Sequence, residues 1–291
     1  MKTFNPKDLE TRELHGLLLG AVGPRPIAFA STISKKGVVN LSPYSFFNVF
    51  SANPPIMIFS PARRVRDNTT KHTLQNCKET KEVVINIVNY DMVQQMSLSS
   101  TEYAEEVNEF EKSGLTMQKS DIVKPYRVKE SPAQFECKIN DIIELGKDGG
   151  AGNLIISEVV KLHISETIFN EDGKIDQYKI DQVARMGGSW YSRANRGMFE
   201  VPKPLSKLGI GVDRIPEMIK HSDILTGNDL GKLGNVEKLP LNDEINHFLK
   251  QEHLVDYVSN CDKKGLHQKA QEYLKGDDTF AAWCILLSKK I

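Results

Sequence analysis

The sequence predicts a mainly β protein with helices (α+β), in which a domain over residues 1–200 precedes an irregular linker and helical extension over residues 201–291. Short runs of β-branched and aromatic residues, separated by Gly, Pro and Asn, fill the first part. Two long β segments then follow, and two amphipathic helical stretches come after residue 240. Antiparallel strands with a few helical crossings indicate a closed or partly closed barrel.

The first elements expected are strands. The runs Ile27–Ser34 and Val38–Leu41 flank the turn Lys35–Gly37 and predict a β-hairpin. Strands Phe46–Ser51 and Ile56–Ser60 follow on either side of Asn53-Pro54-Pro55, which cannot lie inside a central strand. The opening quarter is therefore a meander.

Helices and longer strands alternate after this meander. Asn68-Thr69-Thr70 supplies a capping residue for a helix that we expect to run to Lys81. The later elements expected are strand Val83–Val88, short helices Tyr90–Ser99 and Glu105–Ser113 with Gly114 as C-terminal cap, and strands Ala133–Leu145 and Leu154–Ile168.

The last third has a different composition. Its glycine-rich run Gly227–Gly234 predicts an irregular connecting segment, as do three prolines, Pro202, Pro204 and Pro216. The stretches Leu241–Asn260 and Leu266–Leu287 have the apolar spacing of amphipathic helices. We expect these helices to pack on the barrel or on a partner subunit.

Charge and composition exclude several classes of protein. Lys plus Arg and Asp plus Glu both number 38, so no net field attracts nucleic acid or an anionic membrane. No apolar stretch approaches the ~20 residues of a membrane span, and the polar start does not resemble a secretory signal. Dispersed histidines and scattered cysteines predict no metal site. The expectation is a soluble cytoplasmic protein with buried, reduced thiols at Cys77, Cys137, Cys261 and Cys284.

Two segments carry candidate binding chemistry. Ser42–Ser45 combines small polar residues, proline and an aromatic, which lets backbone groups approach a flat heterocycle; a tight turn between core strands is the structural alternative. Ser60–Thr73 is basic and hydroxyl-rich and leads into the predicted helix start, as a phosphate site requires. The alternative there is a solvated basic loop with an ordinary cap.

These segments resemble the flavin reductase-like, FMN-binding split-barrel family, in its branch of flavoredoxin and the reductase component of nitrilotriacetate monooxygenase. The resemblance covers roughly residues 17–200 and rests on several motifs in order. They are Pro24-Arg25-Pro26, Asn40-x-x-Pro43-x-Ser45-Phe46-Phe47, Pro54-Pro55, Lys71-His72-Thr73 with His in place of the family's Asp, Leu154–Val160, and Arg185-x-Gly187-Gly188-x-x-Tyr191.

The resemblance implies which residues contact FMN. The expected cofactor contacts are Arg25, Asn40, Ser42, Pro43, Tyr44, Ser45, Phe46, Ser60, Lys71, Thr73, Arg185 and Tyr191. Lys71 and Thr73 are expected at the 5′-phosphate. Arg185 and Tyr191 are expected beside the stacked nicotinamide; the alternative for these two is a surface ion pair and a core aromatic. In shorter flavin reductases a histidine stands at a place that corresponds to a position near Gly152 here, not to His163. We therefore expect His163 to make a structural hydrogen bond.

The implied function is an NADH- or NADPH-dependent flavin reductase that passes hydride to N5 of FMN and electrons onward to a monooxygenase or other acceptor. Because the flavin carries the chemistry, no catalytic side chain is expected. The family also implies a homodimer. The alternatives are an FMN-carrying electron-transfer protein without turnover of its own and a structural barrel that has lost its ligand. No dinucleotide-binding, Walker or zinc-protease motif competes with this reading.

Overall fold

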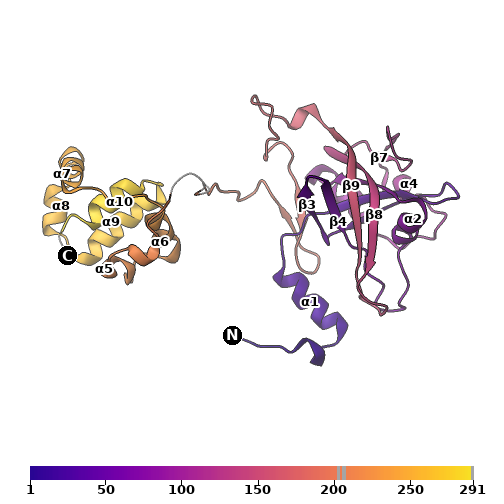
Figure 1. Ribbon diagram of the computed structural model, residues 1–291, viewed down its shortest axis with the longest axis horizontal. Helices are drawn as coiled ribbons and strands as arrows, with labels where there is room; N and C mark the ends of the chain where they lie inside the picture. Colours follow the sequence, from indigo (N-terminus) through magenta and orange to yellow (C-terminus); the bar gives the residue numbers. More distant parts are fainter. Residues whose placement is uncertain (202–203, 205–207, 290–291) are drawn as a thin grey trace. The chain divides into compact units, whose positions relative to one another are not determined.

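The computed structural model describes residues 1–201, 204 and 208–289, which divide into two compact units, Met1–Phe199 and Glu200–Ile291 (Figure 1). We call them the barrel unit and the helical unit and describe each by itself. Part of the expected linker, with Pro202, lies outside the described residues, as do residues 290–291.

The barrel unit is built on a seven-stranded antiparallel sheet in the order β2-β1-β5-β8-β9-β4-β3. Its strands are β1 (Ala28–Ile33), β2 (Val39–Tyr44), β3 (Phe47–Ala52), β4 (Pro55–Phe59), β5 (Glu82–Ile87), β8 (Ala133–Glu144) and β9 (Asn153–Ile164). Two small two-stranded sheets accompany it, formed by β6 (Met117–Gln118) with β7 (Arg127–Val128) and by β10 (Val183–Arg185) with β11 (Tyr191–Arg193).

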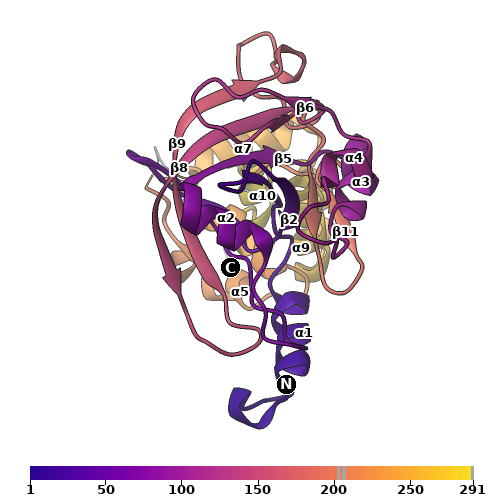
Figure 2. The same ribbon diagram turned by 90° about the vertical axis from the view of Figure 1, so that its right-hand side faces the viewer.

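The large sheet curls into a split barrel. β2 and β3 are its two edge strands, yet only Ser45 and Phe46 separate them in the chain. A flat sheet of seven strands would hold its edges about 29 Å apart, whereas the three Cα steps from Tyr44 to Phe47 span at most about 11 Å. The edges therefore meet without pairing, and Figure 2 shows the curvature in β8 and β9. The predicted fold class is confirmed.

The expected hairpins form as the turn residues dictate. β1 and β2 pair antiparallel with Ile33 opposite Val39, and Gly37 adopts a φ of 85° in the turn. That left-handed conformation strains residues other than glycine. β3 and β4 form the second hairpin, which has a bulge between Val49 and Ser51.

Several helices differ from expectation. α1 (Thr11–Ala21) was not expected, and α2 begins at His72 rather than Asn68 and runs to Thr80. Asn68 adopts a left-handed φ of 56°, and the Arg64 guanidinium holds the Thr70 carbonyl at 2.8 Å, so this segment stays a loop. The other short elements are 3-10 helices at Pro6–Asp8, Tyr90–Met92 and Glu166–Ile168, and helices α3 (Val93–Leu98) and α4 (Glu109–Ser113), the last capped by Gly114 as expected.

Alternation along the strands separates two apolar clusters. On β1, Ala28 and Ala30 join the cluster that contains Leu74 and Cys77 of α2. Phe29, between them, points into the cluster with Met92, Met96 and Phe110, as side chains on opposite faces of a strand must. Helix α2 therefore covers one face of the sheet, while α3 and α4 cover the other.

The helical unit contains α5 (Glu217–Lys220), α6 (Gly227–Gly234), α7 (Asn242–Gln251), α8 (Val255–Asn260), α9 (Lys263–Lys275) and α10 (Thr279–Leu286), with a 3-10 turn at Val212–Arg214. Its core is its own. Trp283 of α10 is 1% exposed, and its indole N–H donates to the Leu233 carbonyl at 3.1 Å. The helical unit thus has a hydrophobic core of its own. The expected packing of its helices on the barrel or on a partner subunit stays a prediction.

Two expectations for this unit were wrong. Gly227–Gly234 is helical because the Thr226 hydroxyl accepts the Asp229 N–H while the Asp229 carboxylate accepts the Thr226 N–H, a capping box. The stretches Leu241–Asn260 and Leu266–Leu287, expected as amphipathic helices, each form two helices, broken near His253 and Asp277, whose φ values are 54° and 60°. The last helix, α10, is buried all round from Ala281 to Leu286.

The cysteines carry no disulfide, and burial raises the pKa of the Cys77, Cys137 and Cys284 thiols, that of Cys284 to about 11. Such thiols are unreactive at neutral pH. Among the helices of the described residues, none combines the length and apolar character that a bilayer crossing needs.

His163 makes the structural hydrogen bond expected of it. Its Nε2 lies 2.7 Å from Oε1 of the buried Glu136 on the paired strand β8. Glu136 also accepts the backbone N–H groups of Asp121, Ile122 and Val123 at 2.7–3.0 Å. Burial alone would raise the pKa of Glu136, but these donors together lower it to about 2.

This carboxylate makes stability depend on pH. Because the pKa in the folded state lies below the ordinary 4.5, the stabilisation is complete above pH 4.5 and is lost as the pH falls toward 2. We expect a loss of ~3 kcal/mol over that window, and Glu136→Gln removes this part of the pH dependence. Denaturant unfolding at pH 5 and pH 2 measures this change in the free energy of unfolding, and the exposed Glu166→Gln serves as control. If wild type and Glu136→Gln lost the same free energy of unfolding between the two pH values, the assignment would be contradicted.

Candidate functional site

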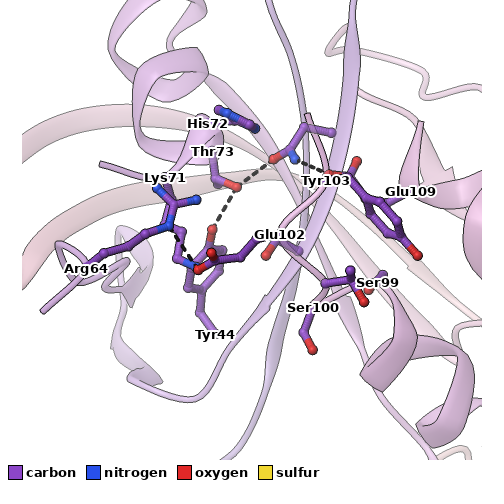
Figure 3. Close-up of a pocket in the computed structure, with 13 residues that line it drawn as sticks. Tyr44, Arg64, Lys71, His72, Thr73, Ser99, Ser100, Glu102, Tyr103 and Glu109 are labelled. Atoms are coloured by element: carbon purple, nitrogen blue, oxygen red, sulfur yellow. Dashed lines mark hydrogen bonds and ion pairs between the residues drawn. The ribbon is translucent and has the colours of Figure 1, made fainter. Parts of the chain in front are cut away.

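A polar pocket opens between β2, the start of α2 and the loop that follows α3, and encloses about 320 Å³ including its mouth (Figure 3). We call it the polar pocket. It is lined by Asn40, Ser42, Tyr44, Arg64, Lys71, His72, Thr73, Ser99, Ser100, Thr101, Glu102, Tyr103 and Glu109. Cations, hydroxyls and a helix N-terminus thus face one space, which is the donor set that binds phosphate.

A second pocket, the central pocket, adjoins the first because both are lined by Tyr44 and Ser100. It encloses about 730 Å³ including its mouth and is lined by Ile27, Pro43, Tyr44, Ser45, Met96, Ser97, Ser100, Arg185 and Tyr191. The Arg185 guanidinium lies 4.6 Å from the centre of the Tyr191 ring. The two pockets together make a crevice that has Arg64 and Lys71 at one end and a mixed lining at the other, where tyrosine rings lie beside serine hydroxyls and Arg185.

A third pocket, the outer pocket, continues from the central pocket through Ser97 and Tyr191. It encloses about 520 Å³ including its mouth and contains a platform in which the Arg193 guanidinium lies 3.9 Å from the centre of the Tyr90 ring. Asp181 holds that guanidinium with two hydrogen bonds of 2.6 and 2.8 Å. The platform is therefore fixed before anything binds to it.

The charge of the polar pocket comes from Arg64 and Lys71. Arg64 Nε lies 3.0 Å and Lys71 Nζ 3.5 Å from Oε1 of Glu102, and Arg66 contacts the other oxygen of this carboxylate. Burial, and next the nearby Arg64, lower the pKa of Lys71. Within the pocket, Arg64 and Lys71 face the single carboxylate of Glu102, while Arg66 outside the lining also pairs with Asp67, so the cluster keeps a positive charge that attracts anions.

A buried hydrogen-bond chain fixes the wall between the polar and central pockets. Tyr44 donates to the Thr73 hydroxyl at 2.8 Å, and Thr73 donates to Asn40 Oδ1 at 2.6 Å. The Asn40 amide then donates to Glu109 Oε1 at 2.8 Å, while the Leu41 N–H donates to the other oxygen at 3.0 Å. Burial raises the pKa of Tyr44 to about 12 and also raises that of Glu109. The Tyr44 phenol is therefore neutral and locked in place.

The structure brings most of the predicted contacts to this crevice, namely Asn40, Ser42, Pro43, Tyr44, Ser45, Lys71, Thr73, Arg185 and Tyr191. Thr73 lies there with its hydroxyl engaged by Asn40 and Tyr44 and is 1% exposed. Its role is to hold the wall, while its position in the first turn of α2 keeps its backbone at the pocket.

Three predicted contacts do not line the crevice. The Arg25 guanidinium donates to the carbonyls of Leu19, Val22 and Met186, and so ties the end of α1 to β10. The Ser60 hydroxyl accepts the Asn153 N–H at 3.0 Å, and Phe46 packs edge-on against the ring of His15. Each is a structural contact, and His163 likewise lies outside the lining of the three pockets.

Sequence reasoning missed the residues that come from the segment 99–109. Ser99, Ser100 and Glu102 follow α3, and Glu109 begins α4. None of these residues belongs to a motif. Glu102 is also negatively charged, which would not lead one to assign it to a phosphate site. Arg64 stood in the basic segment, but nothing distinguished it from the adjacent Arg63, which bonds to Asn68 outside the pocket.

The profile of the family described as "Flavin reductase like domain" matches residues 21–179, which is more than half of the chain. The chain belongs to this flavin reductase-like family. The match spans β1 to β9 and the polar pocket, and it ends before β10 and the helical unit. The family is flavin-binding and flavin-related oxidoreductases belong to it.

Relatives of this flavin reductase-like protein match about two thirds of its length. An uncharacterized protein of Aquifex aeolicus is 38% identical over 191 residues, covering 66% of this chain and 95% of its own. The Bacillus cereus nitrilotriacetate monooxygenase component B is similar in structure, with 30% identity, a TM-score of 0.65, and coverage of 69% of this chain and 98% of its own. Pseudomonas fluorescens 2-nitrobenzoate 2-nitroreductase NbaA is 25% identical, with a TM-score of 0.64, and covers 72% and 100%.

Proposed function

We propose that this flavin reductase-like protein binds FMN in the polar and central pockets and uses NADH or NADPH to reduce it. The observation that carries the proposal is the adjoining of a cationic pocket and an aromatic-lined pocket through Tyr44 and Ser100. FMN has the same division into a phosphate and a planar ring. When bound, the flavin supplies N5 as acceptor of a hydride.

The residues present fit the phosphate. Arg64 and Lys71 face the polar pocket together with the N-terminus of α2, whose first N–H groups have no partner within the helix. Charge-assisted hydrogen bonds from arginine and lysine are the strong ones in proteins. The polar pocket would therefore hold the 5′-phosphate.

The central pocket fits the ring. Pro43 and Ser45 line it from the end of the edge strand β2 and the residue after it. On its outer side this edge strand has no neighbouring strand in the sheet to accept its backbone hydrogen bonds. Tyr191 and Pro43, both partly exposed, supply apolar surface, and burial of such surface drives binding of planar ligands. These residues bind and orient the ring and exclude water from it.

The outer pocket would take the nicotinamide dinucleotide or another second substrate. It meets the central pocket at Tyr191, so a molecule lying in it borders the flavin position. The Tyr90–Arg193 platform offers a stacking surface for a ring, as cation–π pairs do. No side chain is asked to act as acid or base in the transfer.

Similarity supports an onward transfer of electrons. Component B of a nitrilotriacetate monooxygenase and a 2-nitrobenzoate 2-nitroreductase are both among the similar structures. We propose that reduced flavin serves a second acceptor, such as a monooxygenase, in the cytoplasm. Free cysteines are in keeping with that reducing compartment.

One experiment tests this function. The purified full chain is mixed with FMN, and flavin fluorescence and the oxidation of NADH and NADPH are followed. Tight binding with steady oxidation at excess FMN supports a reductase. Bound flavin that nicotinamides do not reduce would favour the electron-carrier alternative, and failure to bind any flavin would leave a structural barrel.

We also propose that the protein pairs with a second copy of itself through β3. This edge strand leaves Val49 57% and Phe50 63% exposed beside unpaired backbone groups, a surface that folded proteins usually cover. We expect light scattering to give twice the chain mass of 32.7 kDa, and Phe50→Glu to give the single mass. The exposed Tyr178→Glu serves as control; a wild-type monomer would contradict the pairing.

A further inference from the structure

The loop between α3 and α4, residues 99–108, places an acidic side chain inside the cationic pocket. Figure 3 shows Glu102 pointing toward Lys71 and Arg64, where the dashed line marks its ion pair. Its two oxygens are divided among the cations, Oε1 facing Arg64 and Lys71 and Oε2 facing Arg66. A carboxylate thus engages the groups on which a phosphate would depend.

The arrangement is costly for a structural ion pair alone. Lys71 and Arg64 are only 29% and 15% exposed, and burial, followed by the proximity of Arg64, lowers the pKa of Lys71. Arg64 also donates to the Thr69 hydroxyl at 2.9 Å and to the Thr70 carbonyl at 2.8 Å, so its guanidinium is held in place without Glu102. The carboxylate is therefore the member of the cluster that can be exchanged for another anion.

The loop is built so that Glu102 can leave. Its backbone hydrogen bonds are local, from Tyr103 N–H to the Thr101 carbonyl and from Val107 N–H to the Ala104 carbonyl. Glu102 itself is 36% exposed at the pocket mouth. Withdrawal of its side chain would break the ion pairs with the cations and leave the strands and α2 as they are.

We propose that Glu102 is a built-in competitor for the phosphate of FMN, so that phosphate binds by displacing this carboxylate and the flavin stays exchangeable. The inference rests on the proposed FMN site. A phosphate and a carboxylate cannot share the same cations without repulsion, since like charges at this distance oppose one another. Glu102 would thus set how strongly the pocket prefers FMN over riboflavin, which lacks the phosphate.

The test compares Glu102→Gln with wild type in the full chain. Flavin fluorescence gives the Kd of FMN and of riboflavin, and inorganic phosphate is titrated as a competitor. We expect Glu102→Gln to lower the Kd of FMN about ten-fold, the equivalent of one weakened ion pair, with riboflavin unchanged and phosphate competing at lower concentration. Glu105→Gln, an exposed acid of the same loop that does not line the pocket, should match wild type.

Every other outcome overturns the inference. An unchanged or raised Kd of FMN in Glu102→Gln would show that the carboxylate orders the cations instead of competing. Equal tightening for FMN and riboflavin would mean that the loop only obstructs the entrance. If wild type binds and turns over FMN but the variant does not differ, the inference alone fails, whereas absence of flavin binding in both removes the proposed function as well.

Discussion

Arg64→Gln combined with Lys71→Gln is expected to weaken FMN binding by about two to four orders of magnitude while riboflavin binding stays near its wild-type value. Each substitution removes one charge-assisted hydrogen bond to the phosphate, worth about 1.5–3 kcal/mol. Two such losses convert into this range of Kd. Fluorescence titration with the two flavins measures the effect, and riboflavin reports directly whether the ring pocket is intact.

The matched control is Arg63→Gln with Lys78→Gln. Arg63 bonds to Asn68, and Lys78, near the end of α2, pairs with Glu144 of β8. Neither Arg63 nor Lys78 lines the polar pocket. The same net charge is removed from the same segment. If this control weakened FMN as much as the pocket variant does, the effect would be one of overall charge, and the phosphate site would have to lie elsewhere.

Trp283→Ala is expected to destabilise the helical unit by about 3–5 kcal/mol, the usual cost of removing a buried aromatic side chain. Trp283 is 1% exposed, lies in the middle of that unit's core and donates a hydrogen bond to Leu233. A domain of this size is stable by only about 5–15 kcal/mol. Calorimetry should therefore show one transition moved to much lower temperature.

The barrel unit provides the comparison. Because it has separate apolar clusters, FMN binding is expected to survive in Trp283→Ala. Trp190→Ala, at a position 78% exposed, should leave the unfolding transitions in place. A single transition that loses flavin binding together with the helical unit would show that the two units do not unfold separately.

The fold was predictable where local sequence and packing agree. Alternation and turn residues determine β1–β2 and β3–β4, and the motif around Asn40 and Pro43 indicated the split barrel. The start of α2 was not predictable, because Arg64 holds the Thr70 carbonyl outside the helix. Gly227–Gly234 likewise forms a helix through a capping box that outweighs the low helix propensity of glycine.

The site was predictable in part. The motif residues Tyr44 and Lys71 line the crevice, whereas Arg25, also a motif residue, is buried and donates to backbone carbonyls instead. Glu102 and Glu109 line the polar pocket although they lie far from β2 in the sequence. Their proximity to β2 depends on how α3 and α4 pack on the sheet, which no local pattern records.

The strand order has a consequence for synthesis of the chain. In the part of the chain that the structure describes, the β3–β4 hairpin pairs with the rest of the sheet through β9 alone, with Ile56 opposite Glu158, so it must wait for roughly 100 further residues. At about 5–20 residues per second, this leaves an unpaired apolar edge for some seconds on the ribosome. Nascent chains halted before β9 should accordingly be bound by chaperones, and chains released after it should not.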